Sequence, residues 1–397
     1  MTILVLNAGS SSIKFQLYEI GPGDALTRRF RGQIDGIGTA HPRLRARDRD
    51  DAPLADDALA PDAVADGEAA QTVLGGWILE RLGAPPRAVG HRVVHGGPDL
   101  AAPALVDDAL LAKLEKLVPL APLHQPNNLA PIRSIRARRP DMPQVACFDT
   151  AFHRGHPAVA ERFALPESLY EQGVRRYGFH GLSYEYIAAQ LPIAAPDIAR
   201  GRVVVMHLGS GVSACGIQDG RSIESTMGFT ALDGLPMGTR PGQLDPGVVL
   251  YLADQQGMAP AAISHLLYHE CGLKGLSGVS NDVRDLLASD SPGARLALDY
   301  FAHRTAQAVA ALGTAMGGLD GIVFTAGVGE NAVPVRAAIC ARLAWIGLML
   351  DEAANRAGGP RISTADSRVA AYVIPTNEER MIAQHTLAVL RRIGGDA

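Results

Sequence analysis

Two short polar turns have the composition and the position that phosphate binding requires. The first, residues 7–12, reads Asn-Ala-Gly-Ser-Ser-Ser, follows the apolar run of residues 3–6, and is followed by Lys14. Glycine-rich turns present backbone N–H groups to phosphate oxygens. A Walker A loop is excluded because its G-x-x-x-x-G-K-[ST] spacing is absent, and because residues 13–17 alternate apolar and polar side chains. That period of two predicts a strand after the turn, where a Walker A loop would lead into a helix.

The same arrangement occurs again in the second half of the chain. An apolar run at residues 203–206 leads into the turn Gly-Ser-Gly at 209–211, and then into a short strand and a hairpin turn at 219–220. A third apolar run, within residues 321–331, ends in another glycine-rich turn. Two matching strand–turn–strand units in separate halves predict a duplicated domain with a phosphate held between facing hairpins.

The composition excludes several classes of protein. The 397 residues are 47% hydrophobic and 20% charged, with a formal net charge of -4. The length allows two domains with separate cores, and the charge argues against nucleic-acid binding, which needs a concentrated basic face. The sequence has neither a signal-peptide pattern nor an apolar run of membrane-spanning length, which predicts a cytoplasmic protein. Its four cysteines form no C-x-x-C pair, so we expect buried, reduced thiols.

Alternating strands and helices must position the turns. Residues 107–118 predict a capped helix, and residues 294–316 predict a long helix that ends at two glycines. The last helix is expected to begin where Thr376 and Glu379 have the spacing of a capping box. By contrast, residues 47–70 are acidic, rich in alanine and free of aromatic residues, which predicts a mobile surface segment.

Nine motifs occur in the order found in the acetate kinases, a family related to sugar kinases, actin and the heat-shock ATPases. They are NAGSSSIKF, GHRVVHGG, CFDTAFH, RRYGFHG, HLGSGVS, STMGFTALDGLPMGTRPG, GVSNDVRDL, FTAGVGEN and IPTNEE. The chain resembles this family from residue 3 to about residue 387. The resemblance implies an α/β protein with two duplicated actin-like ATPase (ribonuclease H-like) domains and a nucleotide cleft between them. Residues 1–150, with a C-terminal helix at about 381–397, would form the carboxylate- and phosphate-side domain, and residues 151–380 would form the nucleotide-binding domain.

The resemblance also implies an activity. A member of this family phosphorylates acetate with ATP, reversibly, giving acetyl phosphate and ADP by direct in-line transfer. Mg²⁺ would be the cofactor, with Mn²⁺ as a substitute, and the protein would be a homodimer with no nucleic-acid or membrane partner.

Four residues would carry the chemistry on this resemblance: Arg92, Asp149, His180 and Arg240. Phosphoryl transfer to a carboxylate brings two anions together, so the site must neutralise charge and fix an in-line approach. Arginine suits both needs because its planar fork meets carboxylate and phosphate oxygens bidentately. The family uses the histidine to stabilise the transition state. A carboxylate nucleophile is already ionised at neutral pH and needs no base, so we expect Asp149 to orient the arginines and Mg²⁺, although the family often assigns it as the acid/base residue.

The other implied contacts fall into three sets. The substrate would contact Arg92, Val94, Leu123, His124, Phe179 and Ala231. The nucleotide would contact Ser10, Ser12, Lys14, His207, Leu208, Gly209, Ser210, Gly211, Asp282, Val283, Arg284, Gly327, Val328, Gly329, Glu330 and Asn331, the last five forming a loop. Asn7 and Glu378 would hold Mg²⁺ together with several waters. From the residues alone, an arginine in a strand equally suits a surface ion pair, a single histidine suits a structural role, and Asp282 suits the first turn of a helix.

The chain departs from the commonest pattern of the acetate kinases at five positions. Ser210, Leu182, Tyr184 and Gln243 stand where the family usually has asparagine, threonine, histidine and an acidic residue. Ala231 stands where a proline commonly forms a wall of the acetyl-methyl pocket. A pocket wider by a methylene or two changes substrate preference by only about 1–3 kcal/mol. Propionate or another short carboxylate is therefore the alternative main substrate.

Two other classes of function fit parts of the sequence. His91 and His95, followed by His153 and His156, suggest a metal-dependent hydrolase, since H-x-x-x-H on a helix can bind zinc. The valines and glycines of VGHRVVHGG favour a strand for the first pair. A nucleotide-gated binding protein would need the phosphate-binding hairpins but not both candidate arginines.

Overall fold

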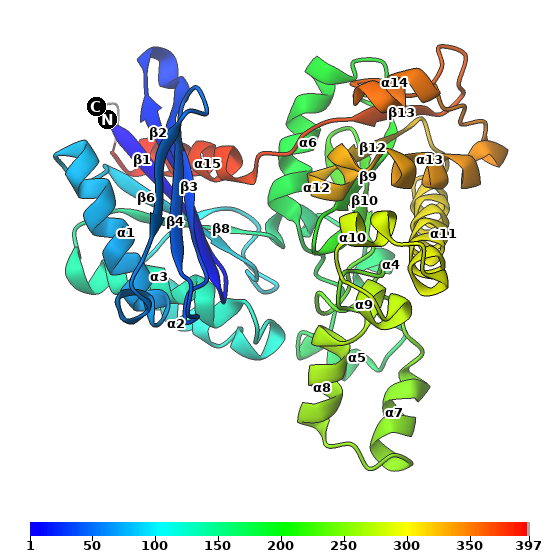
Figure 1. Ribbon diagram of the computed structural model, residues 1–397, viewed down its shortest axis with the longest axis horizontal. Coiled ribbons are helices and arrows are strands. Elements are labelled where there is room, and N and C mark those ends of the chain that lie inside the picture. The colour runs from blue at the N-terminus through cyan, green and yellow to red at the C-terminus, as the bar shows by residue number, and fades with distance from the viewer. Residues whose placement is uncertain (395–397) are drawn as a thin grey trace. The chain divides into compact units, whose positions relative to one another are not determined.

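The chain folds as two compact units, seen in a computed structural model that describes residues 1–394 (Figure 1). The first unit contains Met1–Ala151 and the segment that begins at Asn377, and the second contains Phe152–Thr376. Each unit has its own mixed β-sheet with helices packed against it. Within residues 1–394, no helix is both long and apolar enough to cross a membrane.

An eight-stranded sheet organises the first unit, in the order β5-β4-β3-β2-β1-β6-β8-β7. The strands are β1 (Thr2–Ala8), β2 (Ser12–Ile20), β3 (Leu26–Asp35), β4 (Arg43–Asp48), β5 (Pro53–Ala58), β6 (Ala88–Val93), β7 (Ala104–Leu105) and β8 (Gln144–Phe148). The first five strands form an antiparallel meander, whereas β6 and β8 run parallel to β1.

Helices cover this sheet and close its core. They are α1 (Gly67–Leu82), α2 (Asp108–Glu115), α3 (Gln125–Arg138) and α15 (Glu378–Gly394), with short 3-10 turns at Pro22–Asp24, Pro61–Val64 and Val118–Leu120. Helix α1 packs Trp77 edge-on against Phe15 and Phe30, with ring centroids 5.6 and 5.4 Å apart. Helix α15 packs on β1, β6 and β8, so the end of the chain completes the unit formed by its beginning.

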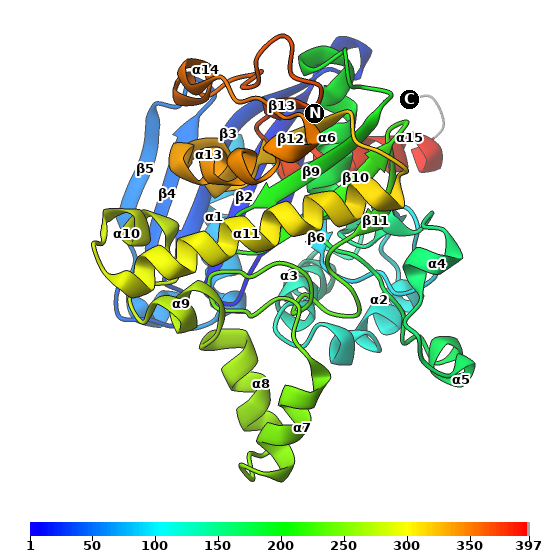
Figure 2. The same cartoon turned by 90° about the vertical axis from the view of Figure 1, so that its right-hand side faces the viewer.

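A five-stranded sheet organises the second unit, in the order β11-β10-β9-β12-β13. The strands are β9 (Arg202–Leu208), β10 (Val212–Gln218), β11 (Arg221–Ser225), β12 (Gly321–Thr325) and β13 (Ala370–Val373). The helices are α4 (Ala158–Glu161), α5 (Glu167–Glu171), α6 (Gly181–Ala194), α7 (Pro246–Asp254), α8 (Pro260–His269), α9 (Gly272–Ser277), α10 (Val283–Ala288), α11 (Pro292–Ala315), α12 (Ala326–Asn331), α13 (Val333–Arg342) and α14 (Glu352–Ala357). Further 3-10 turns lie at Ala151–His153 and Ala344–Ile346. Figure 2 shows the long helix α11 lying across β9 and β10, which it contacts.

The two sheets share one topology. Strands β3-β2-β1-β6-β8 of the first sheet and β11-β10-β9-β12-β13 of the second have the same order, with two antiparallel pairings followed by two parallel ones. The predicted strand–turn–strand units are β1–β2 and β9–β10. The predicted duplication is therefore confirmed at the level of strand order.

The acidic segment at residues 47–70 is not the mobile excursion that its composition predicts. It contains β5, which pairs antiparallel with β4, then the fully buried Val64 and the start of α1. The prediction is wrong because backbone pairing at a sheet edge needs no apolar side chains. An ion pair between Asp56 and Arg43, 2.5 Å long, also joins the two strands.

Two further local predictions are wrong. The last helix has no capping box: the Arg380 N–H bonds to Asn377 Oδ1 at 2.9 Å, Thr376 Oγ1 bonds to Ser183, and Glu379 Oε2 accepts from Gln16 Nε2. Residues 327–331 form helix α12 in place of the predicted loop. The side chain of Glu330, from within that helix, accepts from the Ala326 N–H and stabilises the first turn.

Candidate active site

The carboxyl ends of parallel strands bring polar side chains together in the first unit. Asn7 lies at the end of β1, Arg92 near the end of β6, and Asp149 directly after β8. Strand β6 lies between the other two, and Arg92 is opposite Cys147 in the register. Carboxyl ends of parallel strands meet at one edge of a sheet. Arg92 therefore contacts Asp149, which is 57 positions away in the sequence, and Asn7, which is 85 positions away.

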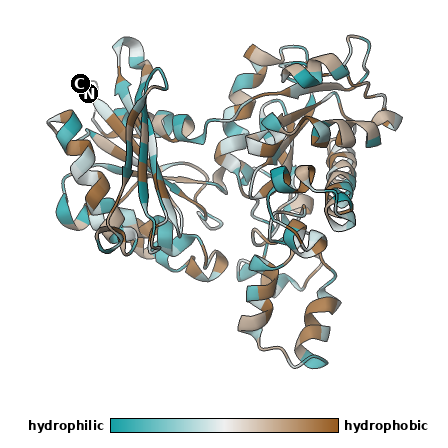
Figure 3. Cartoon of the chain, in the orientation of Figure 1, coloured by the Kyte–Doolittle hydropathy of each residue, from teal (hydrophilic) through white to brown (hydrophobic). Residues whose placement is uncertain are grey.

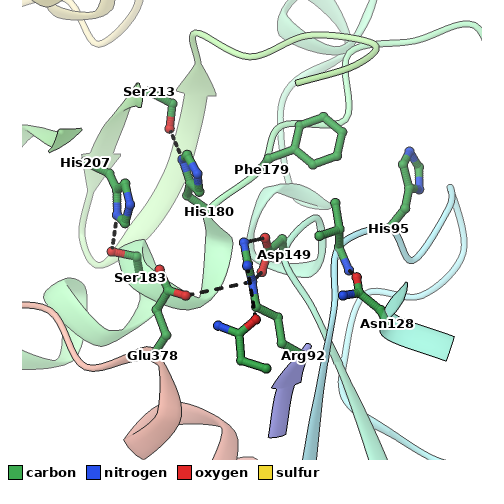
Figure 4. A network of polar contacts seen from close by, with 12 residues as sticks. Arg92, His95, Asn128, Asp149, Phe179, His180, Ser183, His207, Ser213 and Glu378 are labelled. Carbon is green, nitrogen blue, oxygen red and sulfur yellow. Dashed lines mark hydrogen bonds and ion pairs between the residues drawn. The ribbon is translucent and has the colours of Figure 1, made fainter. Parts of the chain in front are cut away.

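Arg92 is the centre of this cluster (Figure 4). Its Nε donates to Asp149 Oδ1 at 3.0 Å and its Nη2 to Oδ2 at 2.5 Å, while Nη1 donates to Asn7 Oδ1 at 3.4 Å. Glu378, the first residue of α15, places Oε2 3.8 Å from Arg92 Nε. The side chains of Asp149, Glu378 and Arg92 are 1%, 12% and 20% exposed, respectively. The two carboxylates therefore hold the guanidinium in one orientation and leave part of its surface accessible.

The charges of this cluster are strongly coupled. Burial acts to lower the pKa of Arg92, but attraction to Asp149 and Glu378 outweighs it, so the pKa is raised. The pKa of Glu378 is raised to about 7: burial is the largest cause, Asp149 and Glu379 act in the same direction, and Arg92 and Lys14 oppose the rise. Arg92 thus stays a cation, and the Glu378 carboxyl is held in a place where an additional cation would favour its ionised form.

Two buried amides of α3 hold the loop that follows Arg92. Asn128 accepts from the Val94 N–H at 2.9 Å and donates to the Ala8 carbonyl at 2.8 Å. Gln125 accepts from the His95 N–H and donates to the His95 carbonyl, at 3.2 and 3.0 Å. Neither residue was predicted to belong to the site. Their signal was the pair of amides three residues apart in HQPNN, beside His124.

The second unit brings together another set of the predicted residues. A Cβ on Gly211 would lie 3.1 Å from both Arg240 Nη2 and His180 Nε2, so the turn between β9 and β10 lies directly against both side chains. The turn is closed by a bond from the Gly209 N–H to the Gly211 carbonyl, at 3.1 Å. A larger residue than glycine at position 211 would therefore displace a predicted catalytic group.

Arg240 is a partly buried cation without a carboxylate partner among the described residues. Its Nη1 donates to the Ala231 carbonyl at 2.8 Å. Burial lowers its pKa, an effect that nearby Tyr268 opposes. A guanidinium kept out of water without a counterion is costly unless an anion binds to it. This arrangement is typical of an anion-binding site.

Two histidines stack beside this turn. The rings of His180 and His207 have centroids 4.2 Å apart and planes inclined by 20°. His180 Nδ1 bonds to Ser213 Oγ, and His207 Nδ1 bonds to Ser183 Oγ, both at 2.8 Å (Figure 4). With both Nδ1 atoms engaged by hydroxyls, each ring is held in a defined orientation. Neither serine was predicted to be a site residue. Ser183 lies on α6 and Ser213 on β10, and each bonds to a histidine that was predicted.

The predicted nucleotide-binding residues occupy both units. Lys14 lies opposite Asn7 in the β1–β2 register, and Ser10 and Ser12 belong to the same hairpin. His207, Leu208 and the 209–211 turn form the second hairpin. The predicted substrate set is also divided: Val94, Leu123 and His124 lie in the first unit, and Phe179 and Ala231 in the second.

Two predicted nucleotide contacts make hydrogen bonds that stabilise helix starts. Glu330 Oε1 accepts from the Ala326 N–H at 2.8 Å and from the Thr376 N–H at 3.2 Å, which stabilises the start of α12. Asp282 caps α10, accepting from the Arg284 N–H at 2.8 Å, and hydrogen bonding to Arg284 lowers the pKa of Asp282 to about 2. These contacts support the helix-start role that the sequence left open for Asp282.

The departures from the family pattern have identifiable contacts. Tyr184 is fully buried and bonds to Ser213 Oγ, the same atom that meets His180. Gln243 accepts from Arg304 Nη2 at 2.7 Å. Leu182 is buried within α6, whereas Ser210 lies exposed in the turn.

The histidine pairs do not form the metal site of a hydrolase. His91 lies in strand β6 and bonds to Gln144, and His153 and His156 both bond to Ser222. Across residues 1–394, no group of three or more His, Cys, Asp and Glu side chains is arranged to hold a metal. Asn7 and Glu378 nevertheless fit Mg²⁺, which prefers oxygen ligands and keeps several waters, and the raised pKa of Glu378 identifies it as a carboxyl that a cation would ionise.

Comparison with known proteins gives a consistent result over nearly the whole chain. The sequence profile of the Acetokinase family matches residues 2–384. A protein of Nitrobacter hamburgensis named acetate kinase is 60% identical over 389 residues, 98% of this chain and 96% of the relative. One of Rhizobium meliloti with the same name is 58% identical over 388 residues, 98% of each chain.

Solved structures of related kinases are consistent with the sequence comparison. A propionate kinase from Francisella tularensis subsp. tularensis SCHU S4 superposes with a TM-score of 0.89 at 36% identity, over 98% of this chain and 99% of the other. The acetate kinase of Porphyromonas gingivalis gives a TM-score of 0.84 at 35% identity, with the same coverage. The predicted two-domain α/β fold and the predicted family resemblance are both confirmed.

Proposed function

Because the chain belongs to the acetokinase family, we propose that it transfers the γ-phosphoryl group of ATP to acetate, reversibly, giving acetyl phosphate and ADP. The observation that carries this proposal is the environment of the Arg240 guanidinium. Its guanidinium lies against the 209–211 turn and His180, and it has no carboxylate partner among the described residues. Such a cation suits a charged phosphoryl group in transit, because phosphoryl transfer is catalysed chiefly by positioning and charge stabilisation.

The residues of the first unit would serve the carboxylate side of the reaction. Arg92, held by Asp149 and Glu378, would present its accessible edge to the acid. Since acetate is already ionised at neutral pH, Asp149 has no proton to remove, and its two oxygens are used to orient the guanidinium. Val94, Leu123 and His124 would complete this side of the substrate site.

The residues of the second unit would serve the nucleotide. The hairpin at 207–211 would contact phosphate through its backbone N–H groups, and α10 and α12 would lie at the adenosine. His180, with Nδ1 bonded to Ser213, directs Nε2 toward Gly211 and would donate to the transferring phosphoryl group. Phe179 and Ala231 would contact the substrate from this unit.

Asn7 and Glu378 would hold Mg²⁺. When bound, this ion neutralises negative charge on the phosphates. Asn7 is itself oriented by Arg92, so the proposed metal ligands and the carboxylate-binding arginine belong to one network.

We assign acetate as the main substrate, with propionate as an accepted one. Most of the support comes from the relatives, which are named acetate kinase. Ala231 makes propionate accessible in this proposal, because it lacks the ring of the proline common at that position. Its carbonyl also accepts from Arg240, so the wall of the proposed methyl pocket and the catalytic arginine are directly joined.

A homodimer is part of the proposal, and helices α7 and α8 are its suggested interface. Helix α7 contains no buried residue, and Leu250 and Tyr251 are 62% and 53% exposed. Figures 1 and 3 show this helix pair extending from the second unit with apolar stretches along it. Light scattering on wild type and on L250D/Y251D tests the assignment: a monomeric variant supports it, and an unchanged mass places any dimer contact elsewhere.

The reaction itself is tested by trapping acyl phosphate with hydroxylamine. Wild type would be supplied with Mg-ATP and acetate, propionate or butyrate, alongside Arg240→Ala and Arg240→Lys. We expect hydroxamate from wild type and a loss of orders of magnitude in Arg240→Ala. Arg240→Lys should recover little of the activity, since lysine lacks the planar fork of arginine. ATP binding without hydroxamate from any acid would instead indicate a nucleotide-gated binding protein.

A further inference from the structure

A chain of buried and partly buried hydrogen bonds in the second unit ends at the residue before His180. His156 Nε2 lies 2.6 Å from Ser222 Oγ, Ser222 Oγ lies 2.8 Å from His153 Nδ1, and His153 Nε2 lies 3.0 Å from the Phe179 carbonyl oxygen. His153 is fully buried and Ser222 is 4% exposed. None of these three side chains has a part in the proposed chemistry.

The last link fixes the direction of the whole chain. A carbonyl oxygen can only accept, so His153 Nε2 carries the proton, and in the neutral ring His153 Nδ1 must accept. The Ser222 hydroxyl therefore donates to His153 Nδ1, and His156 Nε2–H donates to Ser222 Oγ. Burial keeps both rings neutral, because it lowers the pKa of His153 to about 4 and that of His156 to about 2. Cys215, with Sγ 3.1 Å from Ser222 Oγ, stays a thiol because burial raises its pKa to about 12.

The segment that receives this bond has an unusual backbone. Gly178 has φ of +74°, and His180, a residue with a side chain, has φ of +58°. The left-handed conformation is unfavourable for a non-glycine residue, because its Cβ comes too close to the following carbonyl oxygen. Tertiary contacts must therefore hold His180 there, just before α6 begins at Gly181.

His153 contacts this segment in two ways. A Cβ at Gly178 would lie 2.6 and 2.7 Å from His153 Cδ2 and Cγ, so the ring rests directly on the glycine. The same ring donates to the next carbonyl, that of Phe179. The packing of the His153 ring on Gly178 and its hydrogen bond to the Phe179 carbonyl together restrict the peptide unit that leads into His180. The resulting orientation of His180 allows its Nδ1 to bond to Ser213 and its ring to stack on His207.

We propose that His153 is a positioning residue for His180, acting through the Phe179 carbonyl at the end of the directed chain from His156 and Ser222. The inference rests on the proposed role of His180 in phosphoryl transfer. It also gives a structural role to His153 and His156, which the sequence suggested only as metal ligands.

A matched pair of variants separates the two ring nitrogens. His153→Gln can place an amide N–H where Nε2 lies and donate to Phe179, whereas the shorter His153→Asn reaches only the position of Nδ1. We expect His153→Asn to lower kcat on the order of 10- to 100-fold, the scale of a misplacement of about 1 Å, with the KM for ATP little changed. His153→Gln should restore most of the activity. Equal activity in both variants would overturn the proposal.

A double mutant tests whether His153 acts through His180. In a His180→Ala background there is no imidazole left to position, so adding His153→Asn should cause little further loss of kcat. A second full loss, multiplying the first, would show a general structural role and would contradict the proposal. Thermal melts of each variant identify those that are folded.

A measurement on the wild-type protein needs neither activity nor a folded variant. Nitrogen-15 shifts of labelled histidine report the tautomer of each ring, and we expect His153 as the Nε2–H form. The Nδ1–H form could not donate to Phe179 and would overturn the inference. If wild type forms no acyl phosphate, the proposed function fails; the tautomer still decides whether His153 holds this segment.

Discussion

Gly90 of β6 lies directly beneath Thr386 of α15: a Cβ at position 90 would come within 2.3 Å of Thr386 Oγ1 and 2.7 Å of Ile382 Cγ2. Glycine thus allows the last helix to rest on the strand that carries Arg92. The same helix carries Glu378 in its first turn, 3.8 Å from Arg92. The absence of one side chain therefore sets the distance between two parts of the candidate active site.

Replacing this glycine should damage both stability and activity. In Gly90→Ala, the added methyl group must push α15 away from β6, and we expect a loss of about 1–3 kcal/mol in the free energy of unfolding together with a lower kcat/KM. Urea unfolding and steady-state kinetics measure the two effects. Gly75→Ala, in helix α1, is the control, because a Cβ there would meet no described atom within 4 Å apart from the adjoining backbone of its own helix; it should be neutral or stabilising by about 0.4–1 kcal/mol. Similar behaviour of the two variants would contradict the packing argument.

The two candidate arginines should respond differently to removal. Arg92→Ala leaves Asp149, 1% exposed, without its partner, and breaking such a pair costs about 3–5 kcal/mol of stability. Arg240→Ala removes a cation that has no carboxylate partner among the described residues, so its stability should change little. Both variants should lose activity by orders of magnitude. Parallel melting curves and hydroxamate assays check this, and a strongly destabilised Arg240→Ala would count against an anion-binding role.

Acid should destabilise the protein through its buried histidines. His91 is 1% exposed, its Nε2 bonds to Gln144, its Nδ1 has no hydrogen-bond partner within residues 1–394, and burial lowers its pKa to about 4. Between about pH 6.5 and pH 4, His91 binds a proton in the unfolded chain but not in the folded protein. The free energy of unfolding therefore falls as the pH falls. The cost is about 1.4 kcal/mol per pH unit for one such group. His153 and His156 contribute with the same sign.

The variant His91→Gln isolates one of these contributions. Between pH 7 and pH 5.5 it should lose about 1 kcal/mol less unfolding free energy than wild type. Urea titrations at the two pH values provide the comparison. An identical pH dependence in wild type and variant would mean that His91 is not held neutral in the folded protein.

Position 231 should influence the choice of acid. We expect propionate to be used appreciably by wild type, and Ala231→Pro to increase the acetate-to-propionate ratio of kcat/KM by about tenfold, within the 1–3 kcal/mol that a methylene-sized change provides. Ratios of kcat/KM measured with both acids test this. A wild-type propionate kcat/KM thousands of times below that for acetate would exclude the open pocket.

Local pattern predicted much of the fold. The period-two runs after both polar turns predicted the β1–β2 and β9–β10 hairpins, and the spacing of apolar residues predicted α11, which spans Pro292–Ala315. These features depend on neighbours in sequence, so the sequence is enough to find them. The motifs likewise singled out Arg92, Asp149 and Glu378, which the structure brings together in one cluster, and His180, Arg240 and Gly211, which it brings together in another.

Other features depend on partners far away along the chain. The acidic strand β5 owes its order to backbone pairing with β4, and the start of the last helix depends on Asn377, with Thr376 bonded to Ser183. The burial of charge is decided in the same way. The Glu378 carboxyl has its pKa raised to about 7 because the fold places it out of water with Asp149 and Glu379. The sequence by itself determined the family, the repeated hairpins and the residue types of the site. Only the tertiary structure decided which of them share a low-dielectric environment, because hydrogen bonds and Coulomb interactions act over a few ångströms of space regardless of separation along the chain.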